Sequence, residues 1–291
     1  MGFNTHEDNI EIFENTVDIC SKNESLKSAI KASREAQKLI LEKDSVESVM
    51  NLTDLAASKN RYTEKAQLIV SKKRTFEAAA GYKNSGDTVA VLNFASASNP
   101  GGGVVNGSRA QEECLCRCST LYFNLDVDSN LAGFYLPHRR ARNPLHNDDI
   151  IYTPNVVIFK SDTSYPKLLE ESDWQKVNVI TCAAPNLRER PSNRYNSGDG
   201  NISIKISDDE LQALHEKRGR RILDVAAAGK NDVLILGAFG CGAFSNKPEV
   251  VAQAYKNILA DYEHAFKVIE FAIYCSPRDE SNYQIFKQIL N

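Results

Sequence analysis

Short apolar runs typical of buried strands alternate with segments of helical periodicity from about residue 67 onward. Because a strand must bury at least one apolar face, this alternation predicts a layered α/β fold in which helices cover a sheet. With 291 residues, the chain is long enough for one large domain or for a domain with an appendage. In chain order the runs are QLIV, TFEAAAGY, TVAVLNF, the segment Gln111–Leu125, NVVIF, VNVITCA, a helix from about Asp208 to Gly229, DVLILGAF, EVVAQAYKNILADYEHAF, VIEFAIYC and a last helix near Asn282–Leu290.

The N-terminal part of the chain has a different character, polar and helical. Apolar residues recur at helical spacing from Ile10 to Cys20, and Thr5 precedes them as an expected N-cap. We therefore expect a helical extension over residues 1–65 that packs on a larger domain over residues 66–291.

Composition and charge exclude several classes of protein. The sequence has no apolar run of about 18 residues and no apolar block near its start, so we expect neither a membrane span nor a signal peptide. The formal net charge of −3 lacks the basic excess of nucleic-acid-binding proteins, so we expect no stable nucleic-acid partner. The seven cysteines lack disulfide-scaffold spacing, which favours a reducing compartment, cytoplasmic or, in a eukaryote, nuclear.

Two glycine clusters each follow a predicted buried strand. Gly101–Gly103 follows TVAVLNF after a short connection, and Gly237–Asn246 (GAFGCGAFSN) directly follows DVLIL. Ligands of open α/β sheets bind at the carboxyl ends of strands, where glycine lets backbone N–H groups approach a phosphate. Neither cluster fits the Walker or the dinucleotide-binding pattern. One such loop is usually only a turn, but two at one sheet edge favour a ligand that carries phosphate.

Gln111, Glu112 and Glu113 follow the first glycine cluster and are expected to open a helix that continues through Tyr122. Acids are common in the first turn of a helix because they complement its dipole. Here, however, the helix returns from the glycine loop, so its start should lie beside whatever that loop binds. A carboxyl group crowded by a second carboxylate and by phosphate has a raised proton affinity. Such a group suits a general acid for glycosidic cleavage.

These motifs together resemble the bacterial-type poly(ADP-ribose) glycohydrolases, a branch of the macrodomain fold. The resemblance is carried by NPGGG, seven residues, QEE, and GAFGCGAF downstream, and it extends over most of Phe76–Ala272. It implies a macrodomain-like three-layer α/β/α fold with a mixed central sheet and an N-terminal helical extension. Residues 66–291 would then form the catalytic domain.

The resemblance also implies a role for each site residue. Glu113 would be the catalytic acid, Glu112 would hold ribose hydroxyls near the scissile bond, and Asn99 would contact the distal ribose. Phe244 would pack against that ribose and orient it. The remaining residues would bind the substrate, mainly by cradling its two phosphates: Gly101, Gly102, Gly103, Val104, Val105, Gln111, Gly240, Cys241, Gly242 and Ala243.

The implied function is hydrolysis of ribose–ribose bonds in poly(ADP-ribose), mainly from chain ends, with ADP-ribose as product. The expected partners are poly(ADP-ribose) or ADP-ribosylated macromolecules, and neither a cofactor nor a metal is expected. Two alternatives remain open. The chain could hydrolyse single ADP-ribosyl units or O-acyl-ADP-ribose, or it could be a reader that binds ADP-ribose without cleaving it. The acid pair favours hydrolysis of poly(ADP-ribose), since a reader has no need of two adjacent carboxylates.

Two further motifs have simpler interpretations. Positions two apart on a helix point about 200° away from each other, so the thiols of Cys114, Cys116 and Cys118 cannot converge on a metal, and we expect small core residues. The compact basic run HRRARN (His138–Asn143) is expected to be a solvated loop, with contact to further substrate phosphates as the alternative.

Overall fold

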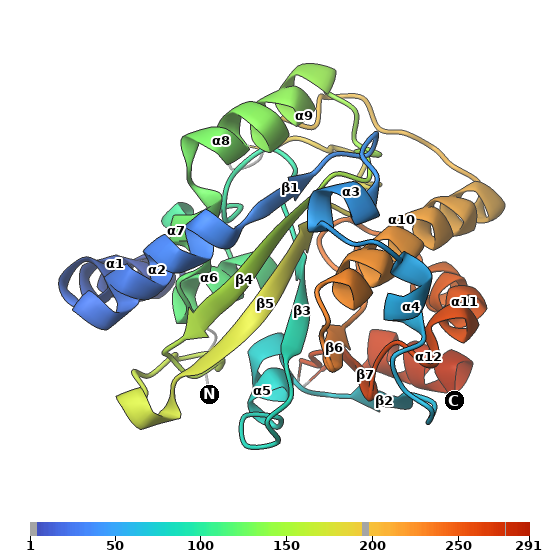
Figure 1. The fold of residues 1–291 in the computed structure, drawn as a ribbon. Helices are drawn as coiled ribbons and strands as arrows, with labels where there is room; N and C mark the ends of the chain where they lie inside the picture. Colours follow the sequence, from blue (N-terminus) through green and yellow to red (C-terminus); the bar gives the residue numbers. More distant parts are fainter. Residues whose placement is uncertain (1–4, 194–197, 277) are drawn as a thin grey trace.

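The computed structural model describes residues 5–193, 198–276 and 278–291, and within them one seven-stranded sheet carries helices on both faces (Figure 1). The strand order is β1-β4-β5-β3-β6-β7-β2. The last five strands in this order are parallel, whereas β4 is antiparallel to both β5 and β1, so the sheet is mixed. The strands are β1 (Lys38–Ile40), β2 (Gln67–Ser71), β3 (Val89–Phe94), β4 (Ile150–Ile158), β5 (Gln175–Cys182), β6 (Val233–Leu236) and β7 (Val268–Ala272).

Two apolar clusters, one on each face of the sheet, hold the three layers together. Along β3, Val89 and Val91 join the cluster of α5 (Thr75–Ala80), α6 (Gln111–Cys118) and α7 (Leu121–Leu125). Ala90 and Leu92 join the cluster of α10 (Asp208–Ala228), α11 (Pro248–Leu259) and α12 (Ser281–Leu290). A central strand that is buried on both faces requires this alternation. The predicted three-layer α/β/α fold with a mixed sheet is therefore confirmed.

Among the helices, α10 and α12 agree closely with those predicted near Asp208–Gly229 and Asn282–Leu290, and TFEAAAGY forms α5. Within the described ranges, none of them combines the length and apolar character needed to cross a bilayer. The helices are α1 (His6–Lys22), α2 (Glu24–Ala36), α3 (Val46–Met50), α4 (Leu55–Lys59), α5 (Thr75–Ala80), α6 (Gln111–Cys118), α7 (Leu121–Leu125), α8 (Asp128–Asn130), α9 (Leu136–Ala141), α10 (Asp208–Ala228), α11 (Pro248–Leu259) and α12 (Ser281–Leu290), with a π-helical turn η2 (Leu131–Tyr135) between α8 and α9.

The N-terminal segment is helical but also contributes to the sheet. Thr5 caps α1 as expected, because its Oγ1 accepts the N–H of Asp8 at 3.0 Å. β1 pairs with β4 at one edge of the sheet, which the sequence did not indicate because three residues are too few to show a period. The boundary at residue 65 stays a prediction.

The helix predicted to run from Gln111 through Tyr122 is wrong in its second half. α6 ends at Cys118, because Thr120 turns toward β4: its N–H donates to the carbonyl of Val157, and its Oγ1 accepts the N–H of the same residue, both at 3.0 Å. The chain resumes as α7 after this turn. The short α6 is thereby fixed at its C-terminal end against the sheet.

Candidate active site

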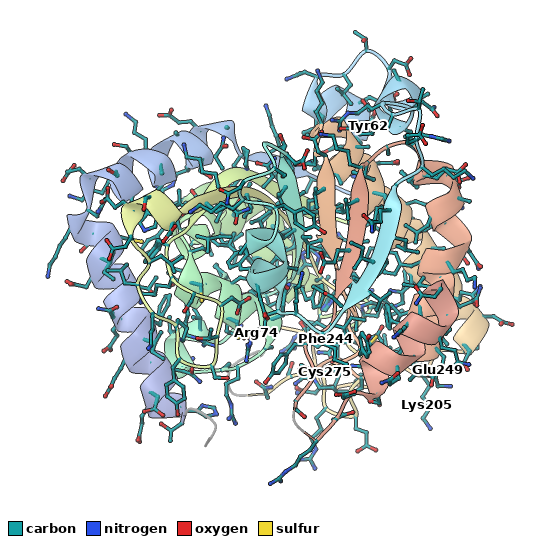
Figure 2. The ribbon with its side chains drawn as sticks, turned by 90° about the horizontal axis from the view of Figure 1, so that it is seen from below. Tyr62, Arg74, Lys205, Phe244, Glu249 and Cys275 are labelled. Atoms are coloured by element: carbon teal, nitrogen blue, oxygen red, sulfur yellow. The ribbon has the colours of Figure 1, made fainter. Side chains whose placement is uncertain are left out.

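The glycine loops after β3 and β6 meet at one edge of the sheet, where they border a cleft of about 840 Å³. The two strands are parallel neighbours, so their carboxyl ends lie side by side, as the sequence predicted. Gly102 lines the cleft from the first loop and Gly240 from the second. Arg74 and Phe244, which also line it, lie beyond the strand ends in Figure 2.

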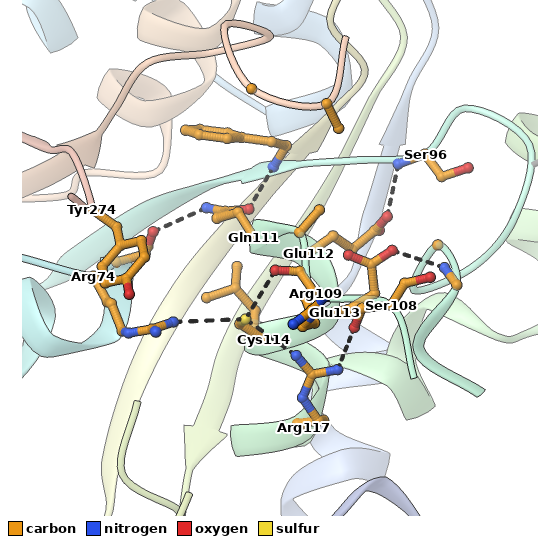
Figure 3. Close-up of a pocket in the computed structure, with 18 of the residues that line it drawn as sticks. Arg74, Ser96, Ser108, Arg109, Gln111, Glu112, Glu113, Cys114, Arg117 and Tyr274 are labelled. Atoms are coloured by element: carbon orange, nitrogen blue, oxygen red, sulfur yellow. Dashed lines mark hydrogen bonds between the residues drawn. The ribbon is translucent and has the colours of Figure 1, made fainter. Parts of the chain in front are cut away.

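Glu112 and Glu113 stand in the first turn of α6 and project into this cleft (Figure 3). Both residues are buried, with exposed fractions of 2% and 7%. Glu112 accepts hydrogen bonds on both oxygens, from Asn93 Nδ2 on Oε1 (3.1 Å) and from the Ser96 N–H on Oε2 (2.7 Å). Glu113 Oε1 accepts the N–H of Gly103 at 2.9 Å, whereas Oε2 is buried and has no partner among the described residues. One oxygen of the pair is therefore available to a ligand.

Burial raises the pKa of both carboxyl groups. Desolvation, followed by the neighbouring charge of Glu113, raises the pKa of Glu112 to about 8. Desolvation also raises the pKa of Glu113, although the hydrogen bond from Gly103 and the positive charge of Arg117 oppose that rise. Two adjacent buried carboxylates do not both ionise readily, so the pair retains a proton near neutral pH.

The two acids differ in the hydrogen bonds that their oxygens accept. Both oxygens of Glu112 face N–H groups, which can donate but not accept, and such donors favour the charged form of a carboxyl group. Oε2 of Glu113 faces no donor among the described residues, so a proton there displaces no hydrogen bond. The hydrogen bonds therefore favour the proton on Glu113 and the charge on Glu112, whereas desolvation and the neighbouring charge, which raise the pKa of Glu112 to about 8, act in the opposite direction.

Gly102 brings the first loop into direct contact with both acids. A Cβ at this position would lie 2.4 Å from Glu113 Oε1 and 3.1 Å from Glu112 Oε2, and the backbone has φ of +60°. Glycine alone combines this left-handed conformation with so close an approach. The sequence explained the triplet by its approach to phosphate, but the structure adds that it packs against the acids.

Gln111 fixes the start of α6 to the end of β3. Its Oε1 accepts the N–H of Phe94 (2.9 Å), and its Nε2 donates to the carbonyl of Leu92 (2.7 Å) and to Thr75 Oγ1 (3.0 Å). The Gln111 side chain thus pairs with backbone groups in the last three residues of β3. Both of its amide hydrogens are donated within the protein, which favours a role in positioning the acids over direct binding of substrate.

Asn246 holds the second glycine loop in shape. This buried side chain donates from Nδ2 to the carbonyl of Gly240 (3.1 Å), and its Oδ1 lies 2.7 Å from His215 Nε2. At the end of the loop, the guanidinium of Arg188 lies over the ring of Phe244, with 5.6 Å from its carbon to the centroid. Both Arg188 and Phe244 line the cleft, so the loop offers backbone N–H groups beside a cation.

Several residues of the cleft were not predicted from the sequence. Arg117 stands four residues after Glu113, so helical spacing alone could have placed it on the same side of α6. Arg74 and Tyr274 come from the ends of β2 and β7, and the guanidinium carbon of Arg74 lies 4.0 Å from the centroid of the Tyr274 ring. Only the sheet topology brings that pair together.

The N-terminal helix α1 also reaches the cleft, through His6 and Asn9. Asn9 Nδ2 donates to the carbonyl of Gly107 at 3.2 Å, in the loop that carries the glycine triplet. Farther along α1, Thr16 Oγ1 donates to the carbonyl of Arg117 (2.6 Å), near the C-terminal end of α6. α1 therefore holds both the first loop and the helix of the acid pair.

The structure brings most of the predicted site residues together. Those that line the cleft are Gly102, Gly103, Gln111, Glu112, Glu113, Gly240, Gly242, Ala243 and Phe244. The other predicted residues, all in the described part of the chain, stand outside the lining: Asn99, Gly101, Val104, Val105 and Cys241. The side chain of Val104 is buried in the core, whereas Val105 is 50% exposed. The binding roles of all these residues stay predictions.

The HRRARN run is not the solvated loop that the sequence predicted. Its first residues belong to α9, and Arg139 donates from Nε to the carbonyl of Ser98 (2.5 Å) and from Nη2 to Asn99 Oδ1 (2.9 Å). The run therefore includes an arginine that ties α9 to the loop after β3. Contact of its other arginines with substrate phosphates stays a prediction.

The cysteines of α6 differ in burial, although both Cys114 and Cys118 line the cleft. Cys116 and Cys118 are buried in the apolar cluster beneath the helix, as predicted. Cys114 is only half-buried and lines the cleft, with Sγ 3.2 Å from Arg117 Nη2, so the prediction of a core residue is wrong there. Across the residues that the structure describes, no three His, Cys, Asp or Glu side chains gather as a metal site requires.

Fold and site together define an α/β protein in which two glycine loops at one sheet edge face a buried pair of carboxyl groups. The family model for the microbial-type PARG catalytic domain matches residues 7–161, more than half of the chain. The chain belongs to this family. A comparison with curated proteins found no match.

Solved structures of poly(ADP-ribose) glycohydrolase (PARG) resemble this fold over nearly its whole length. The enzyme from Thermomonospora curvata is 27% identical, with a TM-score of 0.80 over 97% of this chain and 99% of that one. The complex of the T. curvata enzyme with the inhibitor ADP-HPD is 28% identical, with a TM-score of 0.77 over 97% of this chain and 99% of that one. The enzyme from Deinococcus radiodurans in complex with ADP-ribose is 31% identical, with a TM-score of 0.73 over 90% of this chain and 96% of that one.

Proposed function

We propose that this protein hydrolyses ribose–ribose O-glycosidic bonds in poly(ADP-ribose), mainly from chain ends, and releases ADP-ribose. The observation that carries the proposal is the unpaired Oε2 of Glu113, buried at the cleft while Gly103 holds the other oxygen of the same group. A retained proton on a fixed carboxyl group is what general acid catalysis needs. The similar structures are those of poly(ADP-ribose) glycohydrolases, one of them with ADP-ribose bound, which supports this substrate.

The two loops would hold the diphosphate of the terminal ADP-ribose unit. The loops 101–105 and 240–244 would cradle its oxygens through backbone N–H groups other than those of Gly102, Gly103, Val104 and Cys241, which donate within the protein. Arg188 would add a positive charge. Such local binding is consistent with a chain whose formal net charge is −3. Asn99 would contact the distal ribose, and Phe244 would pack against it.

Glu113 would give its proton to the leaving ribose oxygen while the glycosidic bond breaks. The sugar then passes through an oxocarbenium-like state, which the negative charges of Glu112 and of the substrate diphosphate stabilise. Water adds to the anomeric carbon and returns a proton to Glu113, which restores the acid. Glu112, held on both oxygens by protein donors, would also keep the ribose hydroxyls in place.

The expected partners follow from this reaction: poly(ADP-ribose) or macromolecules that carry it, in the cytoplasm. Residues 1–65 would form the N-terminal extension and residues 66–291 the catalytic domain. The extension would have a definite task, since α1 contacts both the first glycine loop and α6.

The test is the release of ADP-ribose from purified poly(ADP-ribose), followed by chromatography. Glu113→Gln keeps the size of the side chain but cannot deliver a proton, so turnover should fall by about 10²- to 10⁴-fold. Glu112→Gln should lower turnover less, because it removes charge and misplaces the ribose without removing the acid. Glu14→Gln, on the exposed face of α1, is the control.

A comparison of ADP-ribose binding with ADP-ribose release distinguishes an enzyme from a reader. Glu113→Gln should bind ADP-ribose about as well as wild type, because the loops supply most of the contacts. A wild-type protein that binds the polymer and releases nothing would be a reader, and the proposed hydrolysis would be wrong. Near-normal turnover of Glu113→Gln would refute the mechanism instead.

A further inference from the structure

Asn93 is a polar residue at a place where an apolar one would be expected. It lies in the central strand β3, with an exposed fraction of 0%, and asparagine is depleted in strands. Its Nδ2 donates to Glu112 Oε1 (3.1 Å) and to Thr181 Oγ1 (3.2 Å) on the neighbouring strand β5. Its Oδ1 is buried and has no partner in the described part of the chain. The amide thus directs both hydrogens at its neighbours and leaves its own acceptor unpaired, although unpaired buried polar atoms are rare.

We propose that Asn93 is a positioning residue that favours the charged form of Glu112 and thereby shifts the shared proton toward Glu113. The inference rests on the proposed function and specifies how the two acids divide their work. Asn93 would not touch the substrate, since it does not line the cleft.

The geometry of Glu112 supports this role. Asn93 donates to Oε1 and the Ser96 backbone to Oε2, and the Gly101 N–H also favours the charged form of Glu112. A proton on either oxygen would point at a group that cannot accept it and would displace a hydrogen bond. Without the Asn93 amide, Oε1 could carry the proton at no such cost. The proton would then be shared with Glu112, and Glu113 would be a weaker acid catalyst.

Few other titratable groups face Glu112. Among the described residues these are Glu113 and Cys116 on α6 and Tyr135 on the π-helical turn η2. Burial raises the pKa of the Cys116 thiol and of the Tyr135 hydroxyl well above their usual values, so both stay neutral in the working range. A pH profile of turnover should therefore report on the acid pair.

The test compares Asn93→Leu, which removes the donor, with Thr181→Val, which removes only the other partner of the same amide. The loss of a proton from Glu112 should set the acid limb of the pH profile of turnover, the range in which turnover rises with pH. Asn93→Leu should move that limb upward by about one pH unit, the size expected for one hydrogen bond to a charged group, and lower kcat at neutral pH about tenfold. KM should change little. Thr181→Val should leave the limb in place, although both variants disturb the β3–β5 contact.

Titration of the Glu112 carboxyl carbon by ¹³C NMR, without substrate, provides a second readout that does not depend on turnover. Its midpoint should rise in Asn93→Leu and stay in Thr181→Val. If Asn93→Leu does not fold, Asn93→Ala makes the same comparison. An unmoved midpoint and acid limb, or equal shifts in both variants, would overturn the role of Asn93. A wild-type protein that cannot cleave the polymer would refute the proposed function, and the NMR titration would still decide on Asn93.

Discussion

Replacement of Gly102 by alanine should disable the acid pair without unfolding the protein. The added Cβ would lie 2.4 Å from Glu113 Oε1, whereas ordinary contact begins at 3.4 Å, so the loop or the carboxyl group must move by about 1.0 Å, the difference between the two. The hydrogen bond from Gly103 to the same oxygen fixes the acid, so either movement disturbs it. A misplacement of about 1 Å at a reacting group can lower the rate about 10²-fold. We therefore expect kcat for poly(ADP-ribose) to fall about a hundredfold.

The variant also forces alanine into a left-handed conformation, which costs about 1–2 kcal/mol whatever surrounds it. Gly86→Ala isolates this cost, since Gly86 has φ of +78° and open space where the Cβ of an alanine would lie. Gly86→Ala should lose stability to urea but keep its turnover.

Steady-state release of ADP-ribose and urea unfolding measure the two effects. If Gly102→Ala turns over like wild type, the loop does not hold the acids in place. If its loss of activity is matched by Gly86→Ala, backbone strain explains the effect and the contact with Glu113 does not.

The remaining predictions concern ligand binding and the N-terminal helix. ADP-ribose at a hundredfold excess over Kd should add about 2.7 kcal/mol to the free energy of unfolding, and AMP much less because it lacks the second phosphate; equal thermal shifts would contradict the two-loop site. Lys160 is buried beside α1, its Nζ donates to Thr16 Oγ1 at 2.8 Å, and burial lowers its pKa to about 8 from 10.5. Below about pH 8 the lysine is charged in both the folded and the unfolded protein. Between about pH 8 and 10.5 only the unfolded protein keeps the proton, so the free energy of unfolding should rise with pH in that window. Lys160→Met should remove this contribution in urea unfolding at successive pH values, and an unchanged pH dependence would show that the lysine is not desolvated.

Much of the site followed from the sequence, because its parts are local. Glycine clusters after strand-like runs and adjacent acids at a helix start are neighbours along the chain, so their pattern survives without a structure. The packing of Gly102 on the acids and the contacts of the Asn93 amide could not be predicted, because they depend on how distant parts of the chain meet. An asparagine inside an apolar run looks the same whether its amide faces solvent or a buried carboxyl group.

Long-range pairings explain the other errors. The end of α6 at Cys118 is decided by hydrogen bonds to Val157, which no local propensity records. The basic run after α8 was expected to be solvated because charge usually is, yet Arg139 binds the loop after β3. Likewise β1 exists only because β4 offers it an edge.

The contacts of α1 also set an order of events during synthesis. Asn9 and Gly107 are separated by 98 positions in sequence, and Lys160 lies farther on. At about 5–20 residues per second, the ribosome exposes α1 roughly 5–20 s before its docking partner in the first glycine loop emerges. During that interval α1 can pack only on the neighbouring α2, through Cys20, Leu26 and Ile30, and neither loop nor acids can be fixed. A segment that is made before its partners is thus among the last to find its place, and the catalytic centre cannot be complete until the first glycine loop and α6 have been translated.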